Sequence, residues 1–300
     1  MSDPDKNNSG GASDAVRDSF QHELNLHGFG FQFRVLKEAR DLHEARKSKW
    51  VFRVSEFPVH VQGSGTRIDF VLFRTSGDWW QADMICECKR ANPATAYWCF
   101  IKAPFVYRGY PKASDPLVFE SVVRSSLNMG ALRTRAVPKE HTRDAYHVAL
   151  PIRTGRSGDA QPVKQSRNEI EDAASQVMRG TNGYVETLSR HPQVMESGEQ
   201  ESIIRLVPVI FTTANLFVSK SDLSTADLET GNVNLQSGQL ERVPWIWYQY
   251  NVSPGIKHAT EPQEKQTKLE DYMLAEHIRS IGIVSPSGIE EFLQHTSESF

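Results

Sequence analysis

The stretch ADMICECKRANP, residues 82 to 93, places two charged side chains in a segment that otherwise reads as a short buried strand ending before Pro93. Glu87 and Lys89 lie two residues apart, so both project from the same face of that strand. Burying a charge costs free energy unless the charge has a partner or a chemical role. The pair therefore indicates either an ion pair or a functional site.

This stretch ends the third of three consecutive strands. Residues 50–61, 66–74 and 79–90 are rich in β-forming side chains, and the short turns QGSG and TSGD separate them. Short turns between such runs are typical of hairpins. The pattern predicts an antiparallel three-strand meander.

Helices are expected before the meander. The first begins near residue 12, where Asp14 can cap it, and its apolar residues recur every four positions as Val16, Phe20 and Leu24. The glycines of HGFG are expected to end it. A second, strongly charged helix is expected at residues 35–49.

The pattern loosens after Pro93 for roughly seventy residues and then becomes regular again. Gly180 or Gly183 is expected to end the amphipathic helix that follows this looser region. The downstream expectations are a short helix at 116–130, a strand at 145–152, the amphipathic helix at 166–183, one or two strands at 203–219, a strand at 241–252 and a short helix near 287–295.

The element order predicts an α+β fold, an α/β/α sandwich in which helix, three-strand meander, insertion, helix and strand surround a mixed sheet. We expect a disordered leader at residues 1–13 and one domain at residues 14–255, with an insertion at about 93–165. Residues 256–300 are expected to be a C-terminal tail with a short helix.

Composition excludes several classes of protein. The most apolar stretch, LVPVIFTTANLFV, is interrupted by Pro, Thr and Asn, so no membrane span is expected. The polar N-terminus does not resemble a signal peptide. Three cysteines, two of them in one strand, do not form a disulfide framework, and a reducing cytoplasm is the expected location.

Charge is unevenly distributed along the chain. Residues 89–167 carry 14 Lys and Arg against five Asp and Glu, a net charge of +9, whereas residues 1–88 carry −2 and residues 168–300 carry −10. A basic middle segment favours a polyanionic partner there. The alternative is that these cations pair with the acidic third of the chain in the fold.

Asp69 is a lone acid within the apolar run RIDFVLF, one strand before Glu87. In a hairpin the two carboxylates can lie side by side, where they repel unless a cation lies between them. Mg²⁺ typically uses one or two carboxylates together with water and a substrate phosphate. Lys89 would then reach the attacking water or the phosphate. The alternative is a cross-strand ion pair on a solvated sheet face.

RIDFVLF followed by MICECKR resembles the PD-(D/E)XK nuclease superfamily, also called restriction-endonuclease-like. The resemblance covers residues 15–90 and 166–220 and implies the same core order of elements. Ile68 stands where the name-giving proline would be. Carried over by position, the metal-binding acids are Asp69 and Glu87, the catalytic lysine is Lys89, the backbone carbonyl of Cys88 is a further ligand, and Glu23 is an acid from the first helix.

Further residues have both a functional and a structural interpretation. Gln176 can contact phosphate or orient the site, or lie on a solvated helix face. Cys86 and Cys88 are expected to pack in the core, since no zinc-type spacing accompanies them. The aromatics of residues 245–250 can stack nucleic-acid bases but more often form core. The basic insertion intersperses Lys102, Arg108, Lys112, Arg124, Arg133, Arg135, Lys139 and Arg143 with Tyr97, Trp98, Phe105, Tyr107 and Tyr110.

The sequence therefore predicts a nuclease that hydrolyses phosphodiester bonds with Mg²⁺, or Mn²⁺ in its place, most simply a DNA endonuclease. The resemblance alone implies restriction, phage defence or repair. The basic segment 89–167 is the expected DNA contact. A non-catalytic nucleic-acid-binding module and an interaction protein remain alternatives. A homodimer or a partner subunit is equally compatible with the sequence.

Overall fold

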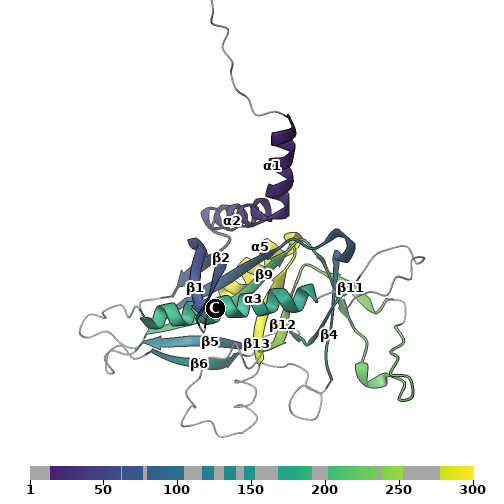
Figure 1. The fold of residues 1–300 in the computed structure, drawn as a ribbon. Helices are drawn as coiled ribbons and strands as arrows, with labels where there is room; N and C mark the ends of the chain where they lie inside the picture. The colour runs from purple at the N-terminus through teal and green to yellow at the C-terminus, as the bar shows by residue number, and fades with distance from the viewer. Residues whose placement is uncertain are drawn as a thin grey trace, which may run out of the picture.

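In the residues that it describes, the computed structural model has two sheets and four longer helices. Figure 1 shows how they are arranged. The residues that the structure describes are 14–61, 63–76, 80–104, 117–124, 132–139, 145–152, 168–190, 202–235, 238–252 and 278–300. In that part of the chain, no helix is long and apolar enough to cross a membrane. The predicted leader at residues 1–13 lies outside these ranges.

The larger sheet has nine strands and is mixed. β1, β2 and β3 pair antiparallel, which confirms the predicted meander, and β9 then runs parallel to β3. The order is β1-β2-β3-β9-β13-β12-β7, while β5 pairs with β9 and β6. The strands are β1 (Val51–Val61), β2 (Ser64–Thr75), β3 (Trp80–Lys89), β5 (Leu117–Arg124), β6 (Leu132–Lys139), β7 (Ala145–Tyr146), β9 (Ser202–Thr212), β12 (Trp245–Asn251) and β13 (Ile278–Val284).

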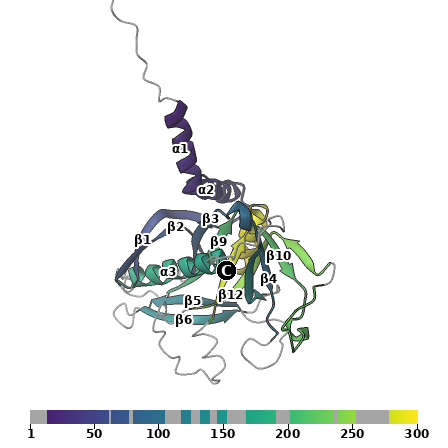
Figure 2. The same cartoon turned by 45° about the vertical axis from the view of Figure 1, so that its right-hand side comes forward.

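The smaller sheet has four strands in the order β11-β10-β4-β8. Figure 2 shows β4 and β10, its central pair, side by side. β4 (Tyr97–Ile101) and β8 (Val148–Ile152) come from the predicted insertion, whereas β10 (Asn215–Ser219) and β11 (Leu240–Val243) follow β9. β4 and β10 are parallel, so the insertion is tied to the segment after β9 by a ladder of backbone hydrogen bonds.

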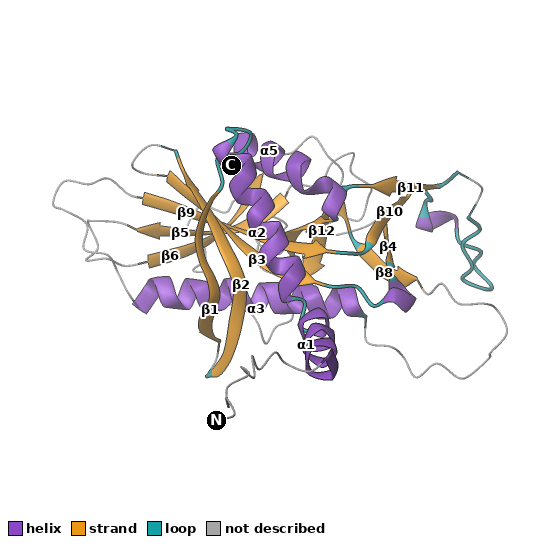
Figure 3. Cartoon of the chain, turned by 90° about the horizontal axis from the view of Figure 1, so that it is seen from above, coloured by secondary structure: helices purple, strands orange, loops and turns teal. Residues whose placement is uncertain are grey.

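Helices cover both faces of the larger sheet (Figure 3). Helices α2 and α5 pack on one face and α3 on the other, so the mixed α/β layering is as predicted. The longer helices are α1 (Asp14–Leu26), α2 (Phe29–Glu44), α3 (Glu169–Arg190) and α5 (Ile289–Ser299), and the 3-10 turns are η1 (Pro93–Thr95), η3 (Leu223–Thr225) and η5 (Pro286–Gly288).

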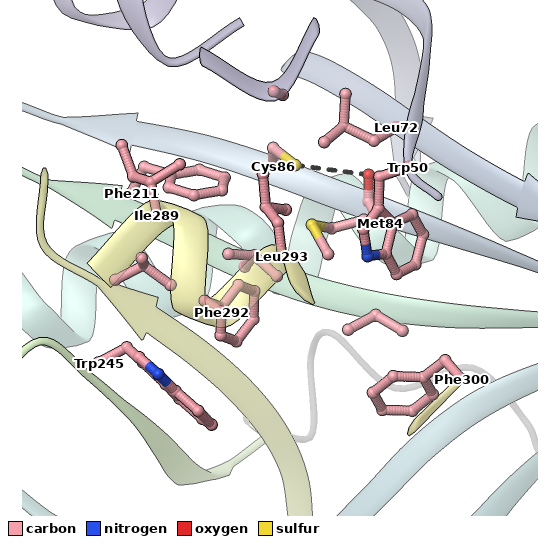
Figure 4. Packing of buried hydrophobic residues seen from close by; sticks show 14 of the residues in the cluster. Trp50, Leu72, Met84, Cys86, Phe211, Trp245, Ile289, Phe292, Leu293 and Phe300 are labelled. Carbon is pink, nitrogen blue, oxygen red and sulfur yellow. Dashed lines mark hydrogen bonds between the residues drawn. The ribbon is translucent and has the colours of Figure 1, made fainter. Parts of the chain in front are cut away.

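The core beneath α2 and α5 is aromatic and aliphatic (Figure 4). Trp245 and Trp247 of β12 are 2% and 1% exposed there, so these aromatics are core rather than a stacking surface. Cys86 points into the same core, and Cys88 packs partly against it, as predicted. Other members of this cluster are Trp50, Phe70, Leu72, Met84, Phe211, Ile289, Phe292, Leu293 and Phe300.

Helix α3 continues to Arg190, past both glycines that were expected to end it. A side chain at Gly183 would come within 2.7 Å of Val59 on β1, and one at Gly180 within 3.1 Å of Ile68 on β2. The prediction of a helix end here was wrong. These glycines allow the helix to approach the sheet closely, and i→i+4 hydrogen bonding simply continues through them.

Within the predicted short helix at residues 116–130, residues 117–124 form strand β5 instead, and the rest of that range lies outside the described residues. The β5 segment is short, β-branched and buried, with Val118 and Phe119 fully covered. A short apolar run does not distinguish a strand from a buried helix turn by periodicity alone. The antiparallel ladder to β9 decides the outcome.

Residues 278–300, expected as part of a tail, belong to the core. β13 pairs with both β9 and β12, and every one of its residues is buried. Arg279 is compensated by an ion pair with Glu120 at 3.2 Å. Arg279, Ser280 and Gly282 dilute the apolar pattern of this strand in the sequence. The predicted short helix near residues 287–295 is α5.

Candidate functional site

The predicted acids lie where two paired strands separate. β2 and β3 are paired from Thr75 and Gln81 as far as Phe70 and Cys86. Beyond that point β2 continues to pair with β1, and β3 continues to pair with β9. Asp69 and Glu87 are the next residues on the two strands, so both occupy the fork.

The alternation of side chains in β2 also changes at Asp69. Ile68 and Val71 both lie in the cluster beneath α3, whereas Phe70 lies in the cluster beneath α2 and α5. Residues with a strict two-residue period would not be distributed in this way. The local irregularity frees Asp69 from the regular pleat, and its Oδ2 accepts a hydrogen bond from the backbone N–H of Cys88 at 2.7 Å.

Burial raises the pKa of the Asp69 carboxyl. The hydrogen bond from Cys88 and the charge of Lys89 oppose this effect, because both stabilise the ionised form. The charge of Glu56 acts in the same direction as burial. Burial therefore disfavours the ionised form of Asp69, and a nearby positive charge stabilises it.

Glu87 is 3% exposed and points to the α3 side of the sheet. Burial, together with the negative charge of Asp69, raises its pKa to about 7. Its Oε1 lies 2.7 Å from Nζ of Lys89, which lowers the pKa but does not offset burial. Glu87 is therefore only partly ionised near neutral pH.

Lys89 links the strand to helix α3. Its Nζ donates a hydrogen bond to Oε1 of Gln176 at 2.8 Å and is ion-paired with Glu87. The Lys89 side chain remains 31% exposed. Gln176 is therefore a hydrogen-bond partner of the lysine, and its role in the site stays a prediction.

The backbone of Cys88 faces the fork. In a strand, the N–H and C=O of one residue point to the same edge. Since the N–H of Cys88 donates to Asp69, its carbonyl also points toward the fork. The thiols of Cys86 and Cys88 have pKa values raised well above the ordinary range, first by burial and then by Asp69, so they stay protonated and are poor metal ligands.

Glu23 is not brought to this cluster. Its side chain is 60% exposed on α1, and its carboxylate lies 3.7 Å from the ring of His27. The apolar residues that recur along α1 are exposed, at 58% for Val16 and 63% for Phe20. Arg90, next to Lys89 in the sequence, donates a hydrogen bond to the backbone carbonyl of Asn25 on α1.

A different acid, Glu56 of β1, lies at the site instead. The β1–β2 register places it opposite Asp69, between the pairs Ser55–Phe70 and Phe57–Ile68. The negative charge of Glu56 raises the pKa of both Asp69 and Glu87. Sequence reasoning missed Glu56, although it is the lone acid of β1 just as Asp69 is the lone acid of β2.

The predicted DNA-facing insertion is only partly described. Trp98 is core at 1% exposure, while Tyr97 and Lys102 are half-buried. Arg124, Arg133, Arg135 and Lys139 belong to strands β5 and β6, and Arg108, Lys112, Arg143, Phe105, Tyr107 and Tyr110 lie outside the described residues. The interaction of this segment with DNA therefore stays a prediction.

The side chains and backbone at the fork provide oxygen donors, the ligand type that Mg²⁺ takes. Among the residues that the structure describes, no group of three or more His, Cys, Asp or Glu side chains is arranged to hold a metal. Asp69, Glu87 and the Cys88 carbonyl offer oxygen ligands only, and Mg²⁺ accepts one or two carboxylates with water and substrate oxygens. The raised pKa of Glu87 is consistent with a site whose compensating charge is a bound cation.

No protein-family model, curated protein or solved structure matches the chain. The site therefore rests on its own geometry.

Proposed function

We propose that this protein is a metal-dependent nuclease that hydrolyses phosphodiester bonds, with DNA as its substrate. The observation that supports this most is the fork between β2 and β3, where Asp69 and Glu87 meet and Lys89 is anchored beside them. A buried acid with a pKa of about 7 next to an oriented lysine is typical of a chemical site rather than a solvated sheet face.

Each residue of this site has a distinct role in the proposal. Asp69 and Glu87, with the carbonyl of Cys88, hold the divalent ion. When bound, such an ion polarises a phosphoryl oxygen and lowers the pKa of a water molecule. Lys89 orients the attacking water or the phosphate, and Gln176 fixes the lysine in position. Orientation of this kind supplies much of the rate enhancement in hydrolysis.

We also propose that the core has the restriction-endonuclease-like arrangement. The order α2, β1, β2, β3, α3, β9 follows the helix, meander, helix, strand pattern expected from the resemblance, and β9 lies parallel beside β3. A role in restriction, phage defence or repair is part of the same proposal. The basic segment 89–167 is the proposed DNA contact.

The test is a cleavage assay on labelled DNA and RNA, single-stranded and double-stranded, with Mg²⁺, with Mn²⁺ and with EDTA. We expect cleavage of DNA only when a divalent ion is present. Asp69→Asn keeps the shape and the acceptor oxygen for Cys88 but removes the charge, and it should abolish cleavage. Cleavage by Asp69→Asn at the wild-type rate would refute the site.

One observation favours a second candidate function. Glu87 and Lys89 already form a direct ion pair, as they would in a non-catalytic nucleic-acid-binding module on the same fold. In that case Asp69→Asn would leave binding and biological activity unchanged, and no divalent ion would be needed. Salt-sensitive binding to a protein and none to DNA would instead indicate an interaction protein.

A further inference from the structure

A second set of polar side chains lies on the β1–β2 side of Asp69. It comprises Glu56 on β1, Gln32 on α2 and Arg67 on β2, and we call it the Glu56 network. Glu56 Oε1 accepts from Nε2 of Gln32 at 2.8 Å, and its Oε2 accepts from a guanidinium N–H of Arg67 at 2.8 Å. Its three members come from three different elements.

The backbone of Glu56 adopts a left-handed conformation, with φ of 52°. A residue with a Cβ rarely adopts this conformation, and in the middle of a strand it is maintained only when surrounding contacts impose it. The Glu56 side chain contributes such contacts, because both of its oxygens are engaged. The chain therefore tolerates a strained residue directly opposite Asp69.

Gln32 ties this network to the site itself. It is 4% exposed, and its amide nitrogen also donates to the backbone carbonyl of Asp69 at 3.0 Å. One side-chain amide thus uses both of its hydrogens, one for Glu56 and one for Asp69. The position of Glu56 is consequently coupled to that of Asp69.

Arg67 is the outward-facing member. Its side chain is 64% exposed, although Glu56 holds it at 2.8 Å. It precedes Asp69 by two residues on the same strand, a separation of about 7 Å along β2. A planar guanidinium with several donors, fixed at one end and open to solvent at the other, is well suited to bind a phosphate.

We propose that Arg67 is a substrate-binding residue that contacts a backbone phosphate of the nucleic acid beside the scissile one, and that Glu56 is the positioning residue that holds it there. This inference rests on the proposed function, because the fork at Asp69 must be the place where the nucleic acid is cleaved. Arg67 then lies on the β1 side of the bound nucleic acid, and Lys89 lies on its α3 side.

The test measures binding without cleavage. Affinity for a fluorescently labelled DNA strand, and for the duplex of the same sequence, is measured in EDTA between about 50 and 200 mM salt. Each phosphate contact contributes about 0.7 for single strands, or about 0.9 for duplex, to the slope of log affinity against log salt. We expect Arg67→Ala to make the slope less steep by about that amount and to weaken binding about tenfold at low salt.

The chain offers a closely matched control. Arg34 on α2 is 63% exposed and is ion-paired with Glu38 at 2.8 Å, so it matches Arg67 in exposure and pairing but not in place. Arg34→Ala should leave the slope unchanged. Arg67→Lys keeps the positive charge but not the planar guanidinium group. It should therefore leave the slope of log affinity against log salt unchanged while weakening binding. Melting temperatures check that each variant is folded.

The positioning role of Glu56 is tested by a double-mutant cycle. If Glu56 holds Arg67 in place, Arg67→Ala should weaken binding less in the Glu56→Gln background than in the wild type. Additive effects would overturn that part of the proposal.

Equal slopes for Arg67→Ala and Arg34→Ala, or no binding of DNA by the wild type, would overturn the substrate contact. Loss of cleavage in Asp69→Asn, together with a salt dependence that Arg67→Ala leaves as in the wild type, would overturn the Arg67 contact but not the proposed function.

Discussion

Glu87→Gln should make the metal-free protein more stable at neutral and alkaline pH while removing its activity. The substitution keeps the shape of the side chain and replaces a buried, partly ionised acid by a neutral amide. Because Glu87 is 3% exposed and lies beside Asp69, its ionised form is unfavourable in the folded state. The amide avoids that cost.

The magnitude follows from the pKa of Glu87. Burial, with the charge of Asp69, raises this pKa from 4.5 to about 7, so between these values the folded protein binds more protons than the unfolded chain. The free energy of unfolding therefore falls as the pH rises through this window. At about 1.4 kcal/mol per pH unit, the loss amounts to about 3 kcal/mol once the pH exceeds the folded-state pKa.

The assay is urea unfolding of wild type and Glu87→Gln in EDTA across the range from about pH 4.5 to about pH 8.5. Glu87→Gln should be more stable at the alkaline end, and the gap should close toward the acidic end. Glu290 provides the control, because Lys47 lowers the pKa of this exposed carboxyl and Glu290→Gln should bring no gain at high pH. A gap that does not vary with pH, or a less stable Glu87→Gln at the alkaline end, would refute the reasoning.

Three further predictions concern the framework. Glu56→Gly should be more stable than Glu56→Ala by about 1 kcal/mol in thermal unfolding, because glycine tolerates a φ of 52°, and equal stabilities would contradict the strained backbone. Gly183→Ala should lower stability by about 1–3 kcal/mol by pushing α3 from Val59, with the less crowded Gly180→Ala as a milder comparison. Phe292→Ala should cost about 3–5 kcal/mol in denaturant unfolding, and a negligible loss would mean that the C-terminal segment is not core.

Local patterns predicted the parts of the fold that depend on local pairing. The meander was predictable because short turns and β-forming runs determine an antiparallel hairpin almost on their own. The contact between Glu87 and Lys89 was predictable because two charges on one face of a largely apolar strand need partners, and the two side chains form an ion pair. The proximity of Asp69 and Glu87 followed from their positions on the two strands of the hairpin, just past the last β2–β3 pair.

Long-range packing decided the parts that were missed. β13 joins β9 and β12 across the middle of the sheet, and its polar residues become acceptable only through partners such as Glu120. Gly180 and Gly183 resembled helix stops because their contacts with the sheet are invisible in sequence. The acid near Asp69 that was missed, Glu56, is brought there by the register of β1 and β2, whereas Glu23 lies on an exposed part of α1.

The most direct measurement of the central claim is single-turnover cleavage of labelled DNA with Mg²⁺ by wild type and Lys89→Ala, purified in the same way. Lys89 sits between Glu87 and Gln176 with its ammonium partly open to solvent, so its loss should affect chemistry far more than folding. We predict a rate at least about a hundredfold lower, with DNA affinity and melting temperature nearly unchanged. Equal cleavage by the two proteins would contradict the assignment of this fork as the nuclease centre.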